Sequence, residues 1–338
     1  MPGAADPAAE RLRTGSRALL LLADSVSVAI LRSLEPGQME SSELMTRVEN
    51  VSRSTYFERL RDLEDISLIA RERSRETPPV AACRLEGAGR CLLRVARLLD
   101  RWLGRSPTGR LTVGDARATA VTKALALGWG STILRWLAER PRSLTELEPL
   151  VEGLGYRKLE RAMRDLDNAG LIERVDAEGR LSPYTVTRWA RESVAVLSAA
   201  VRWERQRIPE RSAAVTGLEV EAGLLLALPL VDVPDAPDGA CVLLIDPEDP
   251  RAGNPAGVVV RMLGGRAIWC VPVPDRKPQD MTSLRGTLPE WLQAVIRGKP
   301  EKLQCVGDAP LTSALMVGLH EALLTRMAPP PGRLFEVA

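Results

Sequence analysis

The hydrophobic pattern near the start of the chain predicts three consecutive helices. The apolar positions are Ile30, Leu31 and Leu34 in the first helix, Leu44 and Val48 in the second, and Tyr56, Leu60 and Leu63 in the third. In each set, a spacing of three or four residues places the side chains on one face of an α-helix. The second helix is predicted to begin near Ser41 or Ser42, and Ser52 is the predicted N-cap of the third.

The segments after the third helix predict a hairpin. Residues 68–71 and 80–85 have the pattern of two short strands, and the tip between them contains Pro78-Pro79. A long helix over residues 92–102 then closes the unit. Three helices, a two-stranded wing and a closing helix together are typical of a winged helix-turn-helix domain.

The same pattern occurs a second time along the chain. Residues 30–71 align without a gap on residues 133–174 at an offset of 103, with 14 identities in 42 positions. The offset becomes 101 after the predicted wing, where Trp102 matches Trp203. In the second set the buried stripe of the third helix is Leu159, Met163 and Leu166, and the closing helix spans residues 188–203. A repeat of this length predicts a repeated structural unit.

A different pattern follows Trp203. Runs rich in Val, Leu and Gly predict four short strands at residues 223–230, 240–245, 257–263 and 266–273. Helices are predicted over residues 289–297 and 311–327, with a short strand at 303–306 between them. The predicted fold class is therefore α+β, with two tandem winged helix-turn-helix domains followed by an α+β domain.

A chain of 338 residues is too long for one core, and the patterns divide it into several segments. The predicted segments are a disordered N-terminus at 1–16, a first winged helix-turn-helix at 17–106, a linker at 107–120, a second winged helix-turn-helix at 121–206, and a C-terminal ligand-sensing or dimerisation domain at 213–330.

Composition narrows the chemistry. The formal charge is only +2, but residues 1–212 carry +6 and residues 213–338 carry −4, so basic side chains concentrate in the repeated part. Five cysteines in no paired spacing and the single His320 disfavour disulfide frameworks, histidine-dependent triads and multi-histidine metal sites. No apolar run approaches the ~18 residues of a membrane span. We expect a cytoplasmic protein with no cofactor and no membrane partner.

The exposed face of each third helix carries the candidate chemistry. In a helix-turn-helix this helix enters the major groove, where an arginine donates two parallel hydrogen bonds to guanine or to phosphate. The candidate DNA-binding residues are Ser52, Arg53, Ser54, Thr55, Arg59, Arg61, Arg73, Arg75, Arg157, Lys158, Arg161, Arg164 and Arg180. The second set is the more basic. Acidic residues such as Glu58 interleave with these cations, and a face of alternating sign is also typical of a simple solvated surface.

The repeated part resembles a known family of regulators. The strings "ILRSL", "SSEL", "SRSTYFERLRDLEDISLIARE" and "PPVAACRLEGAGRCLL" resemble the HxlR family of bacterial transcription regulators, which is close to the PadR and MarR families. The strings "ILRWL", "LTEL" and "LERAMRDLDNAGLIERV" have the same order in the second set. The resemblance implies binding to double-stranded DNA, commonly as a homodimer. Two fused units imply either a monomeric pseudo-dimer or a homodimer.

The last third resembles a second family. The passage "LRGTLPEWLQAVIRGKPEKLQCVGDAPLTSALMVGLHEALL" is similar to the end of a sterol carrier protein domain. That resemblance implies a twisted sheet and helices around an apolar cavity, and hence a hydrophobic small-molecule effector. Trp269, Trp291, Leu292 and Leu315 are the candidate lining residues, although each is more typical of an ordinary hydrophobic core.

Two other classes of function compete with a transcription regulator. An architectural or protein-docking protein of chromosome or plasmid maintenance also uses tandem winged helices. A nucleic-acid enzyme, such as a winged-helix DNA glycosylase, is disfavoured because the sequence places no nucleophile with a base, no metal cluster and no phosphate loop. We therefore expect no catalytic residues. Operator, effector and the sense of regulation stay open.

Overall fold

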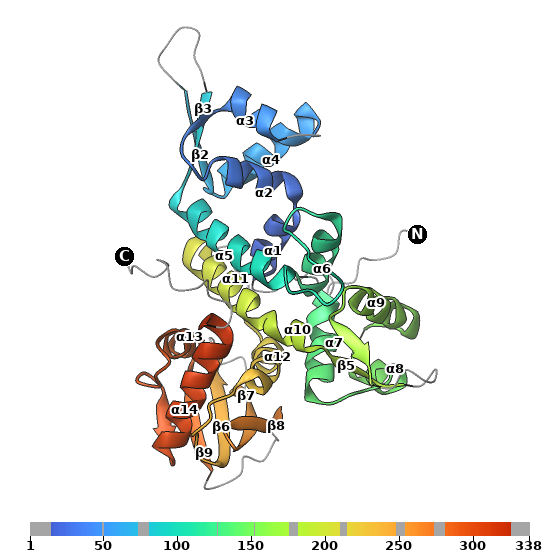
Figure 1. Ribbon diagram of the computed structural model, residues 1–338, viewed down its shortest axis with the longest axis vertical. Coiled ribbons are helices and arrows are strands. Elements are labelled where there is room, and N and C mark those ends of the chain that lie inside the picture. The colour runs from blue at the N-terminus through green and yellow to red at the C-terminus, as the bar shows by residue number, and fades with distance from the viewer. Residues whose placement is uncertain are drawn as a thin grey trace. The chain divides into compact units, whose positions relative to one another are not determined.

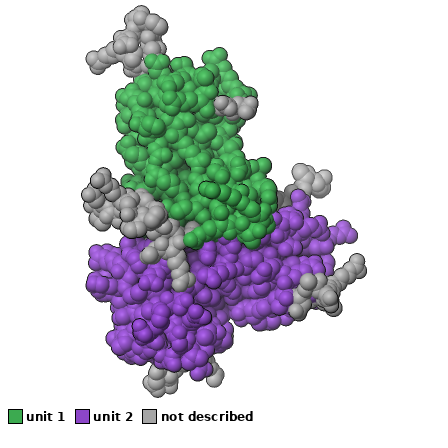
Figure 2. Space-filling view, in the orientation of Figure 1, with its two compact units in different colours: residues 1–127, 196–213 green, residues 128–195, 214–338 purple. Residues whose placement is uncertain are grey.

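The computed structural model describes residues 15–48, 51–73, 81–126, 128–151, 153–175, 182–209, 215–247, 254–273 and 281–325. Contacts divide the chain into two compact units, which Figure 2 colours separately. Unit 1 is Met1–Leu127 with Val196–Ala213, and unit 2 is Gly128–Ala195 with Ala214–Ala338. This grouping differs from the predicted boundaries, because the second predicted winged segment is divided between the two units.

Unit 1 is mainly helical (Figure 1). Its helices are α1 (Ser16–Ala23), α2 (Ser25–Ser33), α3 (Ser41–Arg47), α4 (Arg53–Asp65), α5 (Gly87–Leu103), α6 (Ala116–Ala126) and most of α11 (Val194–Arg207). Its strands β1 (Met39–Glu40), β2 (Ile69–Arg73) and β3 (Ala81–Leu85) form an antiparallel sheet in the order β1-β3-β2. The three predicted helices, the two wing strands and the closing helix are confirmed here.

Helix α6 begins within the predicted linker. Residues 107–120 were predicted as a linker, but a helix begins at Ala116. At the repeat offset of 103, α6 is the counterpart of α1: Ser16 corresponds to Thr119 and Ala23 to Ala126. We call residues 16–103 the first copy and residues 119–204 the second copy. This alanine-rich helix has only a weak amphipathic pattern, so its periodicity does not predict it.

Helices α1 and α6 pack against each other through reciprocal contacts. The Ser16 hydroxyl donates to the Ala126 carbonyl at 2.8 Å, and the Thr119 hydroxyl donates to the Ala23 carbonyl at 3.1 Å. Corresponding residues thus exchange the same hydrogen bond in both directions. The buried apolar residues also correspond, being Ala18, Leu22 and Ala23 in α1 and Val121, Leu125 and Ala126 in α6. This exchange is the signature of a two-fold related contact.

Unit 2 begins with the rest of the second copy. It contains α7 (Gly128–Glu139), α8 (Leu144–Leu147), the 3₁₀ turn η1 (Glu148–Leu150), α9 (Tyr156–Asn168), the paired strands β4 (Ile172–Arg174) and β5 (Tyr184–Val186), and α10 (Arg188–Glu192). The hairpin register repeats that of the first copy. Ile172 pairs with Val186 as Ile69 pairs with Leu85, and an isolated bridge joins Arg142 to Tyr184 where Met39 pairs with Cys83.

The C-terminal part of unit 2 is a five-stranded sheet with helices. The strands β6 (Gly239–Asp246), β7 (Ala256–Leu263), β8 (Arg266–Pro272), β9 (Thr282–Thr287) and β10 (Gln304–Val306) lie in the order β10-β9-β6-β7-β8. Strands β6 and β9 are parallel, and the other neighbours are antiparallel. The helices are α12 (Gly217–Ala227), α13 (Leu288–Arg297) and α14 (Ala309–His320), with the 3₁₀ turn η3 (Leu228–Leu230) and the π-helical turn η5 (Glu321–Thr325).

The strands predicted from residues 240, 257, 266 and 303 onward and the helix at 289–297 are confirmed, and the helix predicted at 311–327 is confirmed as far as His320. The strand predicted at residues 223–230 is wrong, because this segment belongs to α12 and η3. A continuous apolar run has no periodicity that separates a buried strand from a buried helix. Here α12 packs against both α7 and β7, and the buried residues of its second half, Leu224 to Ala227, are not confined to one face.

The buried Arg135 and the half-buried Arg191 connect α12 to the second copy. The Arg135 guanidinium of α7 pairs with Glu221 of α12, with the Arg135 Nε lying 3.1 Å from the carboxylate, and it stacks 3.7 Å above the Trp136 ring. Arg191 of α10 donates to the Leu225 carbonyl at 2.8 Å. Burial lowers the pKa of Arg191. These contacts join α7, α10 and α12 into one packed layer.

Candidate nucleic-acid interface

Helix α4 is built as a capped helix with one buried face. The Ser52 hydroxyl accepts a hydrogen bond from the Thr55 amide at 3.1 Å, which confirms the predicted N-cap. The predicted stripe is buried, since Tyr56, Leu60 and Leu63 are each at most 1% exposed. Packing of that stripe leaves the opposite side of the helix to solvent.

The predicted residues on the other faces of α4 differ in their freedom. Ser52, Arg53, Ser54 and Arg61 are exposed, whereas Thr55 and Arg59 are half-buried. Arg59 is held by two carboxylates, with Asp24 at 3.1 Å and Asp62 at 3.0 Å. The hydrogen bond to Asp62, with the charge of Asp24 added to it, raises the pKa of Arg59. DNA contact by Arg59 therefore requires competition with both carboxylates.

Helix α9 presents a more open cationic face. Leu159, Met163 and Leu166 are buried as predicted. Arg157, Lys158, Arg161 and Arg164 are all exposed, and Arg164 pairs with Glu160 at 3.2 Å. Within the described part of the chain, the other three cations make no ion pair. The first turn of α9 thus combines unpaired cations with the free amides of a helix N-terminus, both of which attract phosphate.

Neighbouring side chains engage several arginines of the described wing strands. Arg71 pairs with Glu64 at 2.9 Å, and the Arg84 Nε lies 2.9 Å from Glu72. Arg174 donates to the Tyr184 hydroxyl at 3.1 Å. Among the candidates, the backbone of Arg73 lies in β2 but its side chain is outside the described residues, as are Arg75 and Arg180 altogether.

Two aromatic residues escaped the sequence analysis. Tyr156 opens α9 and is 46% exposed, and Phe57 of α4 is 36% exposed beneath the Arg53 guanidinium, which lies 5.7 Å from the ring centre. A signal was available for Tyr156, because an aromatic residue directly precedes the basic pair Arg157-Lys158.

The structure separates the four candidate ligand-binding residues. Trp269 is 50% exposed and lines a groove on the sheet. Trp291 is buried and donates to the Leu244 carbonyl at 2.8 Å, and Leu315 is fully buried. Leu292 is half-buried, and neither it nor the two buried residues line the groove. Trp291 and Leu315 therefore act as core residues.

The comparison with protein families matches the first copy. Residues 21–107 match the HxlR-like helix-turn-helix family. This HxlR-like segment extends from the end of α1 to just beyond α5 and includes α4 and the first wing. Such a segment is typical of DNA-binding transcription regulators. The prediction of an HxlR-type reader is confirmed for these residues, whereas the tandem arrangement and the sterol carrier-like domain stay predictions.

Other comparisons limit what can be transferred from relatives. No curated protein matches the chain. Among the described residues, no helix is long and apolar enough to cross a membrane. The same part of the chain contains no group of three or more His, Cys, Asp and Glu residues that could hold a metal ion.

Proposed function

We propose that the chain is a DNA-binding transcriptional regulator in which the two copies act as a fused pseudo-dimer of winged-helix readers. The HxlR-like match supports the first reader. The second reader is supported by the hairpin register that both copies share and by the cationic face of α9. The proposal includes no catalytic step.

The reciprocal α1–α6 contact carries the pseudo-dimer part of this proposal. In a two-fold dimer, residue i of one subunit contacts residue j of the other, and j contacts i. Ser16 with Ala126, and Thr119 with Ala23, satisfy that rule within one polypeptide. The C-terminal ends of the copies support the same pairing, because the Trp203 indole of α11 donates to the Ala88 carbonyl of α5 at 3.0 Å.

The two recognition faces differ, so we propose two unequal half-sites. Helix α9 carries Arg157, Lys158 and Arg161 free of ion pairs within the described residues, while α4 offers Arg53 and Arg61 beside an Arg59 that carboxylates already hold. Each phosphate contact contributes about −0.9 to the slope of log affinity against log salt. The half-site read by α9 is therefore expected to dominate the salt dependence.

The test compares footprints and salt dependence. Genomic fragments selected by the full chain are footprinted with the R157A/R161A variant, the R53A/T55A variant and the R297A control, which removes an exposed arginine of α13. We expect the first pair to lower the salt slope by about 2 and to remove one half of the footprint. The R53A/T55A variant should weaken protection of the other half of the footprint.

Three results would contradict the proposal. One is a footprint indifferent to the R157A/R161A change, and another is an equal loss in the R297A control. A third is the absence of selected DNA together with salt-insensitive pairing to another protein, which would favour the docking alternative.

Part of the proposal is also that a hydrophobic effector bound by the C-terminal region shifts the population of DNA-competent chains, which requires a difference in effector affinity between the two states.

A further inference from the structure

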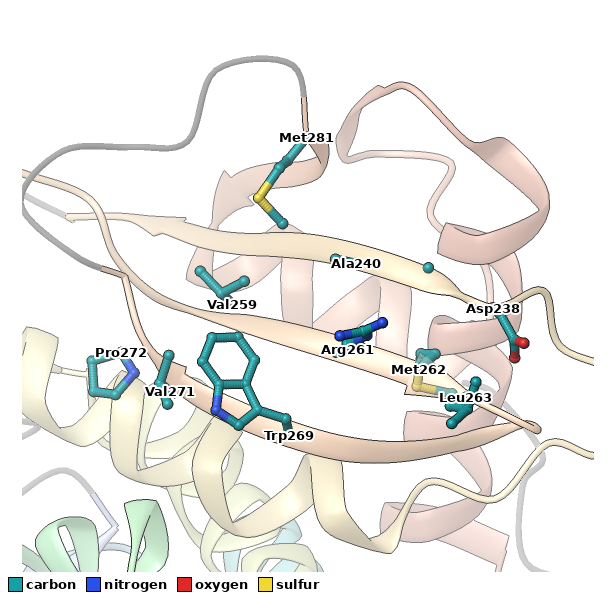
Figure 3. A pocket seen from close by; sticks show the side chains of 11 residues that line it. Asp238, Ala240, Val259, Arg261, Met262, Leu263, Trp269, Val271, Pro272 and Met281 are labelled. Atoms are coloured by element: carbon teal, nitrogen blue, oxygen red, sulfur yellow. The ribbon is translucent and has the colours of Figure 1, made fainter.

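One face of the C-terminal sheet carries an open groove of about 810 Å³ (Figure 3). The helices lie behind the sheet in this view, and the side chains of Val259, Arg261 and Trp269 project from the near face. Contacts agree with this arrangement, since Cys305 of β10, on the far face, lies 3.3 Å from Thr312 of α14. The groove is thus separate from the helix-covered side of the sheet, where a sterol carrier-like cavity would be expected.

The floor and walls of the groove are mostly apolar. Val259, Val271 and Met281 line the groove, and they pack on the buried residues Val242 and Leu244 beneath it. Trp269 is left half-exposed at the edge strand. Ligand sites are typically concave apolar surfaces of ~300–1,000 Å³ with few polar groups, and this groove has that character.

Two charged residues line this apolar surface: Asp238, whose carboxylate accepts a hydrogen bond from the Gly264 amide at 2.7 Å, and Arg261 of β7. Arg261 is the cross-strand partner of Trp269, and both line the groove. The sheet has two other arginines on its described strands, and each pairs with a carboxylate: Arg266 with Asp232 at 3.4 Å and Arg285 with Asp246 at 2.8 Å. Arg261 has neither an ion pair nor a hydrogen bond with any described residue.

We propose that this groove binds an amphipathic organic anion, with a carboxylate or sulfonate on Arg261 and an apolar chain or ring against Trp269 and Val271. An anion supplies the negatively charged partner that the Arg261 guanidinium lacks among the described residues. Charge-assisted hydrogen bonds to arginine are strong. A neutral apolar ligand would cover a cation without pairing it, and a cationic ligand would meet a like charge. The inference rests on the proposed sensor role of the C-terminal region.

The test uses the full chain without DNA, so that a failed site and a failed regulator are distinguishable. The aromatic sulfonate 1-anilinonaphthalene-8-sulfonate is titrated by fluorescence, and decanoate, decanol and decylamine then compete with it. We expect decanoate to displace the probe at the lowest concentration of the three. The R261M variant should bind the probe and decanoate with an affinity lower by about tenfold or more, and it should lose the preference for decanoate over decanol. The W269A variant should bind all of these ligands with lower affinity.

Matched controls separate the groove from the general surface. R285M removes a paired arginine of the same sheet, and I268A removes an exposed apolar side chain next to Trp269; both should leave binding unchanged. Circular dichroism checks that each variant is folded. The proposal is overturned if the native chain fails to bind the probe, if R261M keeps the preference for decanoate, or if the controls lose as much affinity. It is also overturned if sedimentation shows a dimer that excludes the probe and that W269A dissociates, since the face would then join two copies of the chain.

Discussion

The two copies of the repeat use corresponding arginines differently. In the first copy, Arg32 pairs with Asp100 of α5, and its side chain is 37% exposed. In the second copy the counterpart, Arg135, is 8% exposed and pairs with Glu221 of α12. One copy therefore closes on itself, while the other is tied to the helix that also packs on the C-terminal sheet. A repeated position can thus be kept in sequence while its partner changes.

The largest effect on stability is expected from breaking these two ion pairs, Arg135 with Glu221 and Arg32 with Asp100. R135M leaves Glu221 without its partner in a mostly buried position, which should cost about 3 kcal/mol of unfolding free energy. R32M disturbs a more exposed pair and should cost at most about 1 kcal/mol. Urea unfolding followed by circular dichroism measures both variants. Equal losses would show that the difference in burial between the two copies has no energetic meaning.

The reciprocal hydrogen bonds give the next largest effect. S16A and T119V each remove one donor and leave a helix carbonyl unpaired, at a cost of about 1 kcal/mol each. Because the two bonds lie at opposite ends of α1, the double variant should lose the sum of the single losses. The exposed S54A change serves as a control and should be neutral. Unfolding of the four variants in parallel tests this, and strongly unequal single losses would argue against a two-fold contact.

Helices α4 and α9 also differ in their N-caps. S52A removes the N-cap of α4 and should destabilise unit 1 by about 1 kcal/mol. Helix α9 has no side-chain cap at Gly155, whose backbone is already extended and has open space around an added Cβ. G155S should therefore stabilise unit 2 by a few tenths of a kcal/mol. Thermal unfolding should move in opposite directions for the two variants, and a shift of the same sign would refute this difference.

The smallest effect concerns pH. Glu204 of α11, which corresponds to Leu103 in the first copy, accepts hydrogen bonds from the Gly15 and Ala18 amides at the start of α1. Burial raises the pKa of Glu204 above its usual 4.5, and the backbone amides oppose part of that change. A raised folded pKa favours the protonated form, so this contribution to stability is present below pH 4.5 and is lost as the pH rises through the folded pKa.

The E204Q variant isolates that contribution. The stability of the native chain relative to E204Q should fall as the pH rises from 4.5 through the folded pKa of Glu204, and then level off. Denaturation midpoints of both proteins over this range supply the measurement. A difference that grows in favour of the native chain with rising pH would show that the amides of α1 outweigh burial.

Much of the first copy was predictable from local pattern. The stripe Tyr56, Leu60 and Leu63 and the cap Ser52 are properties of neighbouring residues, which periodicity and capping rules capture. The ion pair of Arg59 with Asp24 was not predictable, because Asp24 lies between α1 and α2, far in sequence from α4. A basic side chain that is predicted from sequence to be unpaired can thus form an ion pair with a carboxylate far away in the sequence.

The missed elements share a physical cause. The second half of α12 is a continuous apolar run because the helix packs between other elements, so this run resembles a strand. The capping box of Thr216 with Glu219 was the local signal for a helix start. Helix α6 required the repeat to be extended back to Thr119. The groove containing Arg261 was beyond sequence reasoning, since it depends on which strands become neighbours.

The contact between α1 and α6 has a consequence for dilution. Both of its halves belong to one polypeptide, so the partner of each helix is always present at a local concentration that the number of molecules in a cell does not change. In the proposed pseudo-dimer, the contact forms without an encounter between two chains. Each half is also free to accumulate its own substitutions without the mirror change that an identical partner would impose.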